Sequence, residues 1–271
     1  MIQQNLSIEF YDGKNRQIRV ILPDDYATSG IKYPVLYMFD GQNLFNSEES
    51  FTGTTWEVRE ALETLLAKGE LEPMILVGID HAEDKRMTEY SPWDLEFADH
   101  HIEGEGHIFA EFLIDQLIPQ LEETFPIQSD QAGRTLAGSS MGALITVYMA
   151  MTYPDYFGHY GVFSLCSWIS QEAFMGFLKQ VAKVPRAAFF VQVGTREGYN
   201  STTDTEDLTI SHGYLQGTTD FVAALAQIGI DQDAIALRIG ETGYHSETTW
   251  REYMPDFLRW IQQKQGINKE S

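Results

Sequence analysis

The sequence has little cysteine and few basic residues. Cys166 is the only cysteine among 271 residues, which excludes an intrachain disulfide and a metal cluster built on several cysteines. Lysine and arginine total 18 against 40 aspartates and glutamates, so the formal net charge is −22. A charge of this sign repels phosphate backbones and anionic membrane surfaces. We therefore expect neither a nucleic acid nor a membrane as a partner.

Long apolar runs are also missing. No stretch approaches the roughly 18 apolar residues that a membrane helix needs, and no basic region followed by a long apolar run stands at the N-terminus. We therefore expect a soluble, cytoplasmic protein without a signal peptide. Neither an internal repeat nor a linker-like composition divides the chain, so a single domain over residues 1–271 is expected. The oligomeric state stays open, a homo-oligomer included.

What the sequence does contain is an alternation of buried-strand and helix patterns. Strand patterns cover residues 6–10, 16–22, 35–39, 74–79, 134–137, 161–165, 187–193 and 234–239. Helix patterns cover residues 56–68, 109–124, 143–151, 170–182, 214–228 and 248–265. The first two strands form a hairpin around Asp12-Gly13, and strands then alternate with helices. This order predicts an α/β fold, a mostly parallel eight-stranded sheet with an antiparallel N-terminal edge and helices on both faces.

The segment Gly138-Ser139-Ser140-Met141-Gly142 lies between one of these strands and a nearly uninterrupted apolar helix. A strand, a G-x-S-x-G turn and a helix in succession are typical of a nucleophile elbow. Glycine is needed on both sides because a side chain there would collide with the neighbouring strand or helix. We therefore predict that Ser140 is a nucleophile next to the first free N–H groups of the helix. Ser139 occupies the variable position of the motif and is the weaker candidate.

A serine hydroxyl becomes a good nucleophile only when a base lies within hydrogen-bonding reach. His245, the last of seven histidines, follows the last predicted strand and so emerges at the same edge of the sheet as Ser140. An acid that orients the imidazole is expected between the two, in the chain order of α/β-hydrolases. Glu197 directly follows the penultimate strand and is the first candidate, with Asp204 and Asp207 as alternatives in the same loop.

An oxyanion hole needs two backbone N–H groups that point at the developing negative charge. Met141, directly after the nucleophile, is predicted to supply one of them. The other is expected from the loop Asp40-Gly41-Gln42-Asn43-Leu44-Phe45, with Gln42 as the first candidate donor and Asn43 as the second. The alternative interpretation is that this loop is only a turn.

Five segments together resemble the Putative esterase family of α/β-hydrolases. They are Asp40-Gly41-Gln42-Asn43-Leu44-Phe45, Arg86 with Glu89-Tyr90-Ser91-Pro92, Gly138-Ser139-Ser140-Met141-Gly142, Tyr153-Pro154-Asp155-Tyr156-Phe157 and Gly243-Tyr244-His245. The family is related to esterase D, to feruloyl and acetylxylan esterases, to siderophore esterases and to the mycolyltransferases. The resemblance runs over nearly the whole chain. It implies an esterase with Ser140 as nucleophile, His245 as base and the carboxylate of Glu197, where many relatives carry aspartate, as third member.

Aromatic side chains and one cation fall in loops or at strand ends that should surround the nucleophile. The predicted substrate-binding residues are Asn43, Arg86, Tyr90 and Trp168, with Trp93 and Phe163 nearby. Aromatic walls with a cation suit an aryl or sugar ester. Each of these side chains taken alone can instead be a packing residue, and Arg86 can instead pair with Glu89.

A group of histidines and glutamates precedes the helix over residues 109–124, namely His100, His101, Glu103, Glu105 and His107. Their spacing matches no zincin motif, and hydrolysis by a serine triad needs no metal. We therefore expect neither a metal nor another cofactor. The polar segment over residues 198–217 is interpreted as a lid that orders over the substrate or as a solvated loop.

These observations predict a serine carboxylic-ester hydrolase that forms an acyl-enzyme on Ser140 and acts on a small ester, an acylated sugar or an aryl ester among the possibilities. Two alternatives stay open. One is an acyltransferase that delivers the acyl group to a carbohydrate hydroxyl, and the other is a non-catalytic relative that binds glycans or siderophores. No readable motif in the sequence names the ester.

Overall fold

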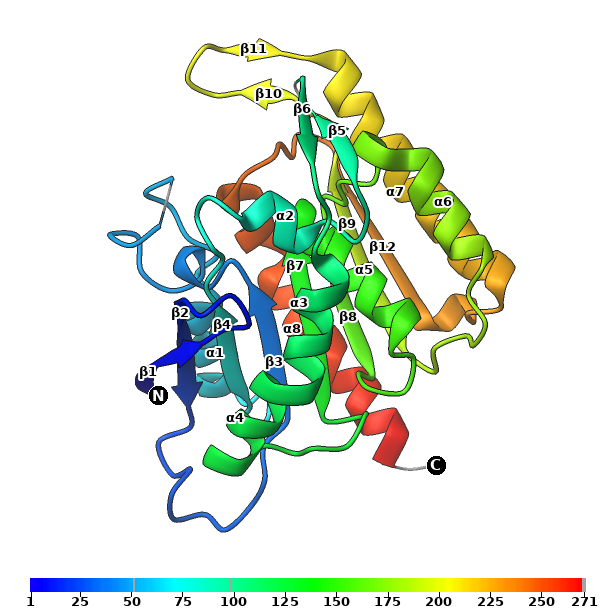
Figure 1. The fold of residues 1–271 in the computed structure, drawn as a ribbon. Coiled ribbons are helices and arrows are strands. Elements are labelled where there is room, and N and C mark those ends of the chain that lie inside the picture. The colour runs from blue at the N-terminus through cyan, green and yellow to red at the C-terminus, as the bar shows by residue number, and fades with distance from the viewer. Residues whose placement is uncertain (51, 98, 270–271) are drawn as a thin grey trace.

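The computed structural model describes residues 1–50, 52–97 and 99–269. An eight-stranded sheet forms its centre, in the order β1-β2-β4-β3-β7-β8-β9-β12 (Figure 1). The antiparallel pairs are β1 with β2 and β2 with β4, and the neighbouring strands from β4 to β12 are parallel. The predicted sheet and its antiparallel edge are therefore confirmed. The strands are β1 (Ile2–Glu9), β2 (Asn15–Leu22), β3 (Val35–Phe39), β4 (Ile75–Ile79), β7 (Arg134–Ser139), β8 (His159–Phe163), β9 (Ala188–Gly194) and β12 (Ile235–Gly240).

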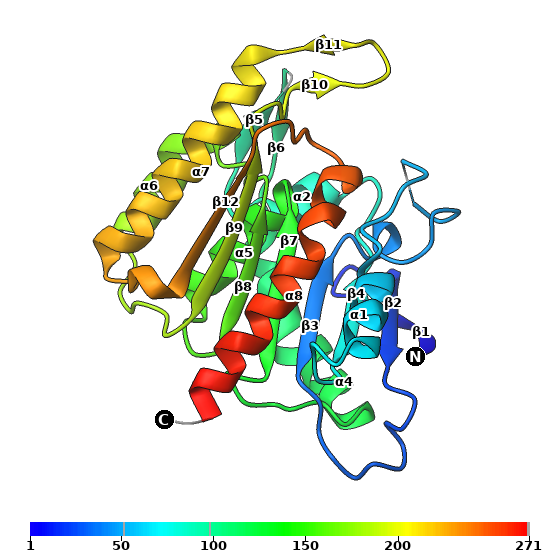
Figure 2. The same cartoon turned by 180° about the vertical axis from the view of Figure 1, so that it is seen from behind.

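Helices cover both faces of the sheet. Figure 1 shows α2 to α7 in front of it, and Figure 2 shows α1 and α8 on the opposite face. Among the described residues, every helix is too short or too polar to cross a membrane. The helices are α1 (Val58–Ala67), α2 (Arg86–Tyr90), α3 (Gly106–Phe112), α4 (Ile118–Thr124), α5 (Met141–Thr152), α6 (Gln171–Lys179), α7 (Leu208–Ile228) and α8 (Glu247–Lys269), with a π-helical turn at Leu113–Leu117 and 3-10 turns at Gly41–Asn43, Trp168–Ser170 and Gln232–Ala234.

Strand β3 shows how one strand serves two apolar cores. All five of its residues are buried. Because side chains alternate along a strand, Val35, Tyr37 and Phe39 pack into the larger core under α2 to α7. Leu36 and Met38 pack into the second core under α1 and α8. The continuous apolar pattern of this strand is thus explained by burial on both faces.

Two small hairpins stand at the top of Figure 1, at the end where the parallel strands finish. One consists of β5 (Leu95–Phe97) and β6 (His100–Ile102), and the other of β10 (Tyr199–Asn200) and β11 (Thr205–Glu206). The second hairpin lies within the polar segment over residues 198–217 that we interpreted as a lid or a loop. The two hairpins flank the carboxyl edge of the sheet, where ligands of parallel α/β sheets commonly bind.

The start of α7 differs from the sequence prediction. The helix begins at Leu208, although the apolar periodicity pointed to residue 214. The reason is a side-chain cap, since the Asp207 carboxylate accepts hydrogen bonds from the N–H groups of Thr209 and Ile210 at 2.9 and 3.2 Å. Half of the polar segment that we interpreted as a lid or loop is therefore the first part of a helix.

Candidate active site

Ser140 lies at the tip of a strained turn between β7 and α5. Its backbone angles are φ 57° and ψ −122°, a region that residues other than glycine rarely adopt. Its N–H donates to the Phe163 carbonyl on β8 at 3.0 Å, which fixes the turn against the next strand. A Cβ atom on Gly138 would lie 2.6 Å from the carbonyl carbon of Gly142. The predicted succession of strand, glycine-flanked turn and helix is therefore present.

This strain gives a prediction about stability. Replacing Ser140 with glycine relieves a backbone strain of about 1–3 kcal/mol. The greater freedom of glycine in the unfolded chain offsets about 0.4–1 kcal/mol of that gain. We expect Ser140→Gly to have a free energy of unfolding about 1 kcal/mol above that of Ser140→Ala, as measured by urea unfolding. A Ser140→Gly variant that is less stable than Ser140→Ala by about 0.4–1 kcal/mol, the cost of the freer unfolded chain alone, would show that the turn is unstrained.

His245 and Glu197 meet at the same edge of the sheet. The imidazole Nδ1 lies 2.8 Å from Glu197 Oε2. The Glu197 side chain is fully buried, whereas that of His245 is 28% exposed. The other carboxylate oxygen, Oε1, accepts from the Gly194 N–H at 2.7 Å and from the Ser164 hydroxyl at 2.6 Å. The Oε1 atom thus accepts two hydrogen bonds that fix the carboxylate, while Oε2 lies within hydrogen-bonding distance of the imidazole.

The two alternative acids lie elsewhere. Asp204 is exposed and accepts from the Tyr199 hydroxyl at 2.9 Å within the β10–β11 hairpin. Asp207 caps α7. Of the three carboxylates that the sequence left open, the structure brings Glu197 to His245.

Ser140 and His245 line one cavity of about 360 Å³. Two of the four predicted substrate-binding residues, Asn43 and Arg86, line it as well. Trp56 and Trp250 form an apolar wall, their rings stacked with centroids 5.1 Å apart, and the edge of the His245 ring contacts Trp250 at 5.1 Å between centroids. The cavity therefore combines a hydroxyl, an imidazole and an aromatic wall.

The loop predicted to complete the oxyanion hole forms a 3-10 turn beside this cavity. The Asn43 N–H donates to the Asp40 carbonyl at 2.9 Å, so it is engaged within the turn. The Gln42 side chain turns to the chain after β4, where its Oε1 accepts from the His81 N–H at 3.4 Å. Met141 is the first residue of α5, a position whose N–H has no acceptor within its own helix. The backbone N–H groups of Gln42 and Met141 remain our predicted donors.

Arg86 lies in the cavity wall as half of an ion pair. Its Nε and Nη2 donate to the two carboxylate oxygens of Asp40, both at 2.7 Å. Burial opposes the charge of Arg86, but the Asp40 carboxylate outweighs it, so the pKa of Arg86 is raised. The predicted partner of Arg86, Glu89, instead pairs with Arg16 at 2.7 Å. Arg86 therefore presents a guanidinium whose charge is largely balanced.

Tyr90 and Trp168 lie behind the cavity. Tyr90 is fully buried, with the Arg86 guanidinium 5.1 Å from its ring centroid, and its hydroxyl accepts from the Asp40 N–H at 3.4 Å. It supports the ion pair from the core side. Trp168 is half-buried and packs edge-on against Tyr214, with 5.6 Å between ring centroids.

Three side chains around the site were missed by the sequence reasoning. Tyr214 places its hydroxyl 3.4 Å from Ser140 Oγ. Trp250 donates from Nε1 to Ser164 Oγ at 2.8 Å, and Ser164 in turn donates to Glu197. Tyr214 and Trp250 lie in helices whose patterns mark them only as buried aromatic residues, and Ser164 lies in an apolar run, so no local signal separates them from the core.

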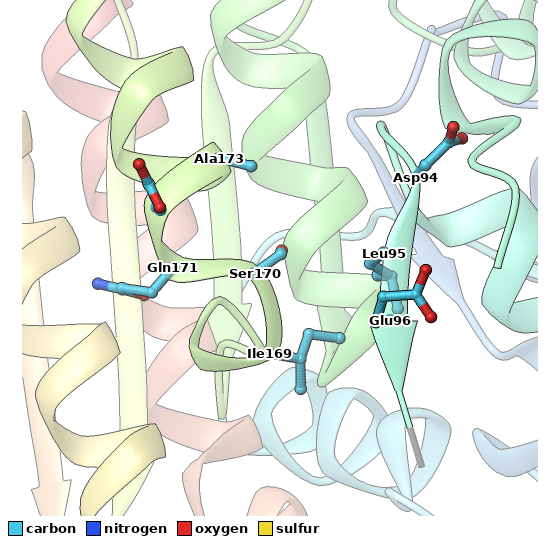
Figure 3. Close-up of a pocket in the computed structure, with 8 residues that line it drawn as sticks. Asp94, Leu95, Glu96, Ile169, Ser170, Gln171 and Ala173 are labelled. Carbon is cyan, nitrogen blue, oxygen red and sulfur yellow. The ribbon is translucent and has the colours of Figure 1, made fainter. Parts of the chain in front are cut away.

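A second hollow, of about 640 Å³, lies between β5 and the start of α6 (Figure 3). In Figure 3 the carboxylates of Asp94 and Glu96 stand on one side, with Ser170 and Gln171 across from them. The residues that line it are a different set from those around Ser140. The predicted chemistry thus belongs to the smaller cavity.

The histidine and glutamate cluster lies around the β5–β6 hairpin. His101 Nδ1 contacts Glu96 Oε1 at 2.7 Å on the exposed surface. Within the described part of the chain, no three side chains of the metal-binding types come together as a possible metal site.

The sequence was compared with protein families and with known proteins. The sequence profile of the Putative esterase family matches residues 11–261. The Bacillus subtilis protein YbbA is 25% identical over 260 residues, which cover 94% of this chain and 96% of YbbA. An endo-1,4-beta-xylanase/feruloyl esterase of Xylanibacter ruminicola is 25% identical over 248 residues, which cover 88% of this chain and 28% of that longer protein.

Among solved structures, the enterobactin esterase FES of Shigella flexneri superposes with a TM-score of 0.72 at 17% sequence identity, over 97% of this chain and 60% of that one. At this level of sequence identity, the superposition shows that the two proteins share a fold. With the observed sheet, it confirms the predicted α/β-hydrolase fold. Since the family profile covers nearly the whole chain, this protein belongs to the Putative esterase family of ester-hydrolysing enzymes.

Proposed function

We propose that the protein is a serine carboxylic-ester hydrolase in which Ser140, His245 and Glu197 form a catalytic triad. The observation that carries the proposal is that a hydroxyl, an imidazole and a carboxylate come together at one cavity. Ser140 and His245 line one cavity, and the buried Glu197 carboxylate contacts the Nδ1 of that histidine at 2.8 Å. A carboxylate on Nδ1 holds the imidazole in the tautomer whose Nε2 can accept a proton.

The first half-reaction forms an acyl-enzyme. Ser140 Oγ attacks the ester carbonyl carbon while its proton passes to His245 Nε2. The negative charge on the carbonyl oxygen is stabilised by the N–H groups of Met141 and Gln42. The tetrahedral intermediate collapses as the bond to the alcohol breaks, and His245 returns its proton to the departing alkoxide.

The second half-reaction hydrolyses the acyl-enzyme. A water molecule gives its proton to His245 Nε2 and attacks the acyl carbon. When the bond to Ser140 Oγ breaks, the serine recovers a proton from the imidazolium and the carboxylic acid leaves. Throughout, Glu197 stays ionised and stabilises the positive charge on the imidazolium.

The cavity supports a small ester as substrate. Its aromatic wall of Trp56 and Trp250 suits an aryl acyl group or a sugar ring, and the nearby side chains of Asn43, Thr52 and Glu247 offer hydrogen-bonding partners. The Glu247 carboxylate and the balanced Arg86–Asp40 pair disfavour an anionic substrate. An acylated sugar or an aryl ester therefore fits, in line with the feruloyl esterase name of one relative.

The test is to trap the acyl-enzyme. A rapid acid quench with p-nitrophenyl acetate, followed by mass spectrometry of the digested protein, should find one acetyl group on Ser140 and none in the Ser140→Ala variant. An adduct on Ser139, or on any other residue in place of Ser140, would contradict the assignment.

Repeating the turnover with a carbohydrate acceptor separates the hydrolase from the acyltransferase, because a transferase makes an acylated sugar. A binding protein without activity forms no adduct.

A further inference from the structure

Tyr214 on α7 contacts two groups of the proposed triad and lies outside every role assigned above. Its hydroxyl oxygen is 3.4 Å from Ser140 Oγ and 3.4 Å from Cys166 Sγ. Its ring faces the imidazole of His245 at 4.8 Å between centroids, with 39° between the planes. Only 5% of the residue is exposed. One side chain therefore contacts the nucleophile and the base together.

The surroundings hold Tyr214 in this position. The Trp168 ring packs edge-on against it, and Trp168 itself is fitted against Gly213, where a Cβ atom would come 3.1 Å from the indole Cγ. Cys166 is tied to the nucleophile turn, because its N–H donates to the Ser140 carbonyl at 3.4 Å. A fixed hydroxyl next to a nucleophile can act without reorganisation during the reaction.

The hydroxyl of Tyr214 stays protonated. Burial raises the pKa of Tyr214 well above its ordinary value, and burial likewise raises the pKa of the Cys166 thiol to about 11. Tyr214 is thus a hydrogen-bond donor at neutral pH and cannot serve as a base. Its single proton has two acceptors within reach, Cys166 Sγ and Ser140 Oγ. The stronger acceptor is whichever atom carries more negative charge.

We propose that Tyr214 is a catalytic residue that donates a hydrogen bond to Ser140 Oγ whenever negative charge develops there, and that its ring holds the His245 imidazole in place. The proposal rests on the triad assignment above. Charge develops on Oγ twice, as the serine attacks and as it leaves the acyl-enzyme. In the resting enzyme the Tyr214 proton is shared with Cys166, and no proton is transferred from Tyr214 at any step.

The phenylalanine variant removes the hydroxyl and keeps the ring. A hydrogen bond to a charged atom is strong enough that Tyr214→Phe should lower both acylation and deacylation rates by about tenfold to a hundredfold. The rate at which a fluorophosphonate probe labels Ser140 should fall by a similar factor, since that reaction also starts with attack by Oγ. Tyr214→Leu also removes the aromatic ring that packs against the His245 imidazole, so it should lose more activity than Tyr214→Phe.

Tyr33→Phe is the matched control. Tyr33 is also buried, and its hydroxyl bonds to Asp25 and Ser29, outside the residues of the cavity. This variant should keep the labelling rate of the parent, and the melting temperature of Tyr214→Phe should stay within the range of that control. Labelling of Tyr214→Phe within twofold of the parent would overturn the proposal. If Ser140→Ala keeps its activity, the triad assignment fails instead, so the two failures are distinguishable.

Discussion

Replacing Ser140 with alanine is expected to lower kcat/KM for a p-nitrophenyl ester by about five to six orders of magnitude. Alanine cannot form the acyl-enzyme, and the remaining imidazole has no hydroxyl to deprotonate. The residual rate comes from substrate binding and from the oxyanion N–H groups, which act on an attacking water. Steady-state release of p-nitrophenol measures this loss, at an enzyme concentration high enough to detect the residual activity.

The alanine variant should fold as the parent does. The contact of Ser140 with Phe163 is made by its backbone N–H, and its carbonyl accepts from the first turn of α5, so the side chain holds none of these bonds. A circular dichroism spectrum and melting curve close to those of the parent are therefore expected. A folded Ser140→Ala variant with more than one tenth of the parental activity would exclude the acyl-enzyme pathway.

The sequence alone placed the sheet and the triad candidates because both depend on short-range patterns. The buried strands are continuous apolar runs, and Ser140 is flanked by glycines that a tight turn requires. Parallel strands end at one edge, so residues that follow two such strands, Glu197 and His245, are expected to meet there. In the structure the Glu197 carboxylate and the His245 imidazole lie 2.8 Å apart at this edge.

The sequence did not locate side chains whose role depends on packing between helices. Tyr214 was placed only as the start of a helix, because the Asp207 cap that extends α7 by six residues carries no apolar periodicity. Tyr90 was expected to face a substrate, and its full burial under Arg86 depends on how α2 packs against α3 and β3. Whether an aromatic residue in a loop or helix faces a cavity or the core is decided by such tertiary packing.

The same reasoning applies to the acid, for which the sequence leaves Asp204 and Asp207 open beside Glu197. A carboxylate after a strand in a chain of net charge −22 is usually a surface residue. What distinguishes Glu197 is its set of partners, the N–H of the nearby Gly194 and, from two distant segments, the hydroxyl of Ser164 and the imidazole of His245. Ser164 is itself oriented by Trp250 on α8. This network is visible only once the chain is folded.

Replacing Glu197 with glutamine is expected to lower kcat by about three to four orders of magnitude, because an amide cannot satisfy all of these partners. If the amide NH₂ faces His245, Nδ1 must accept a hydrogen bond and the imidazole must take the tautomer with its proton on Nε2. A protonated Nε2 can no longer accept the proton of Ser140. If the NH₂ faces the opposite way, it meets the Gly194 N–H, another donor, and that buried group loses its acceptor.

Asp204→Asn and the double variant of Ser140 and Glu197 complete this experiment. Asp204 lies on the exposed hairpin, so its amide variant should keep kcat within about twofold of the parent. The double variant Ser140→Ala/Glu197→Gln should be no slower than Ser140→Ala alone, because in the proposed triad the carboxylate acts only through the imidazole and the serine that it activates. Independent losses that multiply in the double variant would show that Glu197 and Ser140 do not belong to one catalytic unit. The shared loss is therefore the sharper test of the triad, since either single variant can lose activity for reasons of its own.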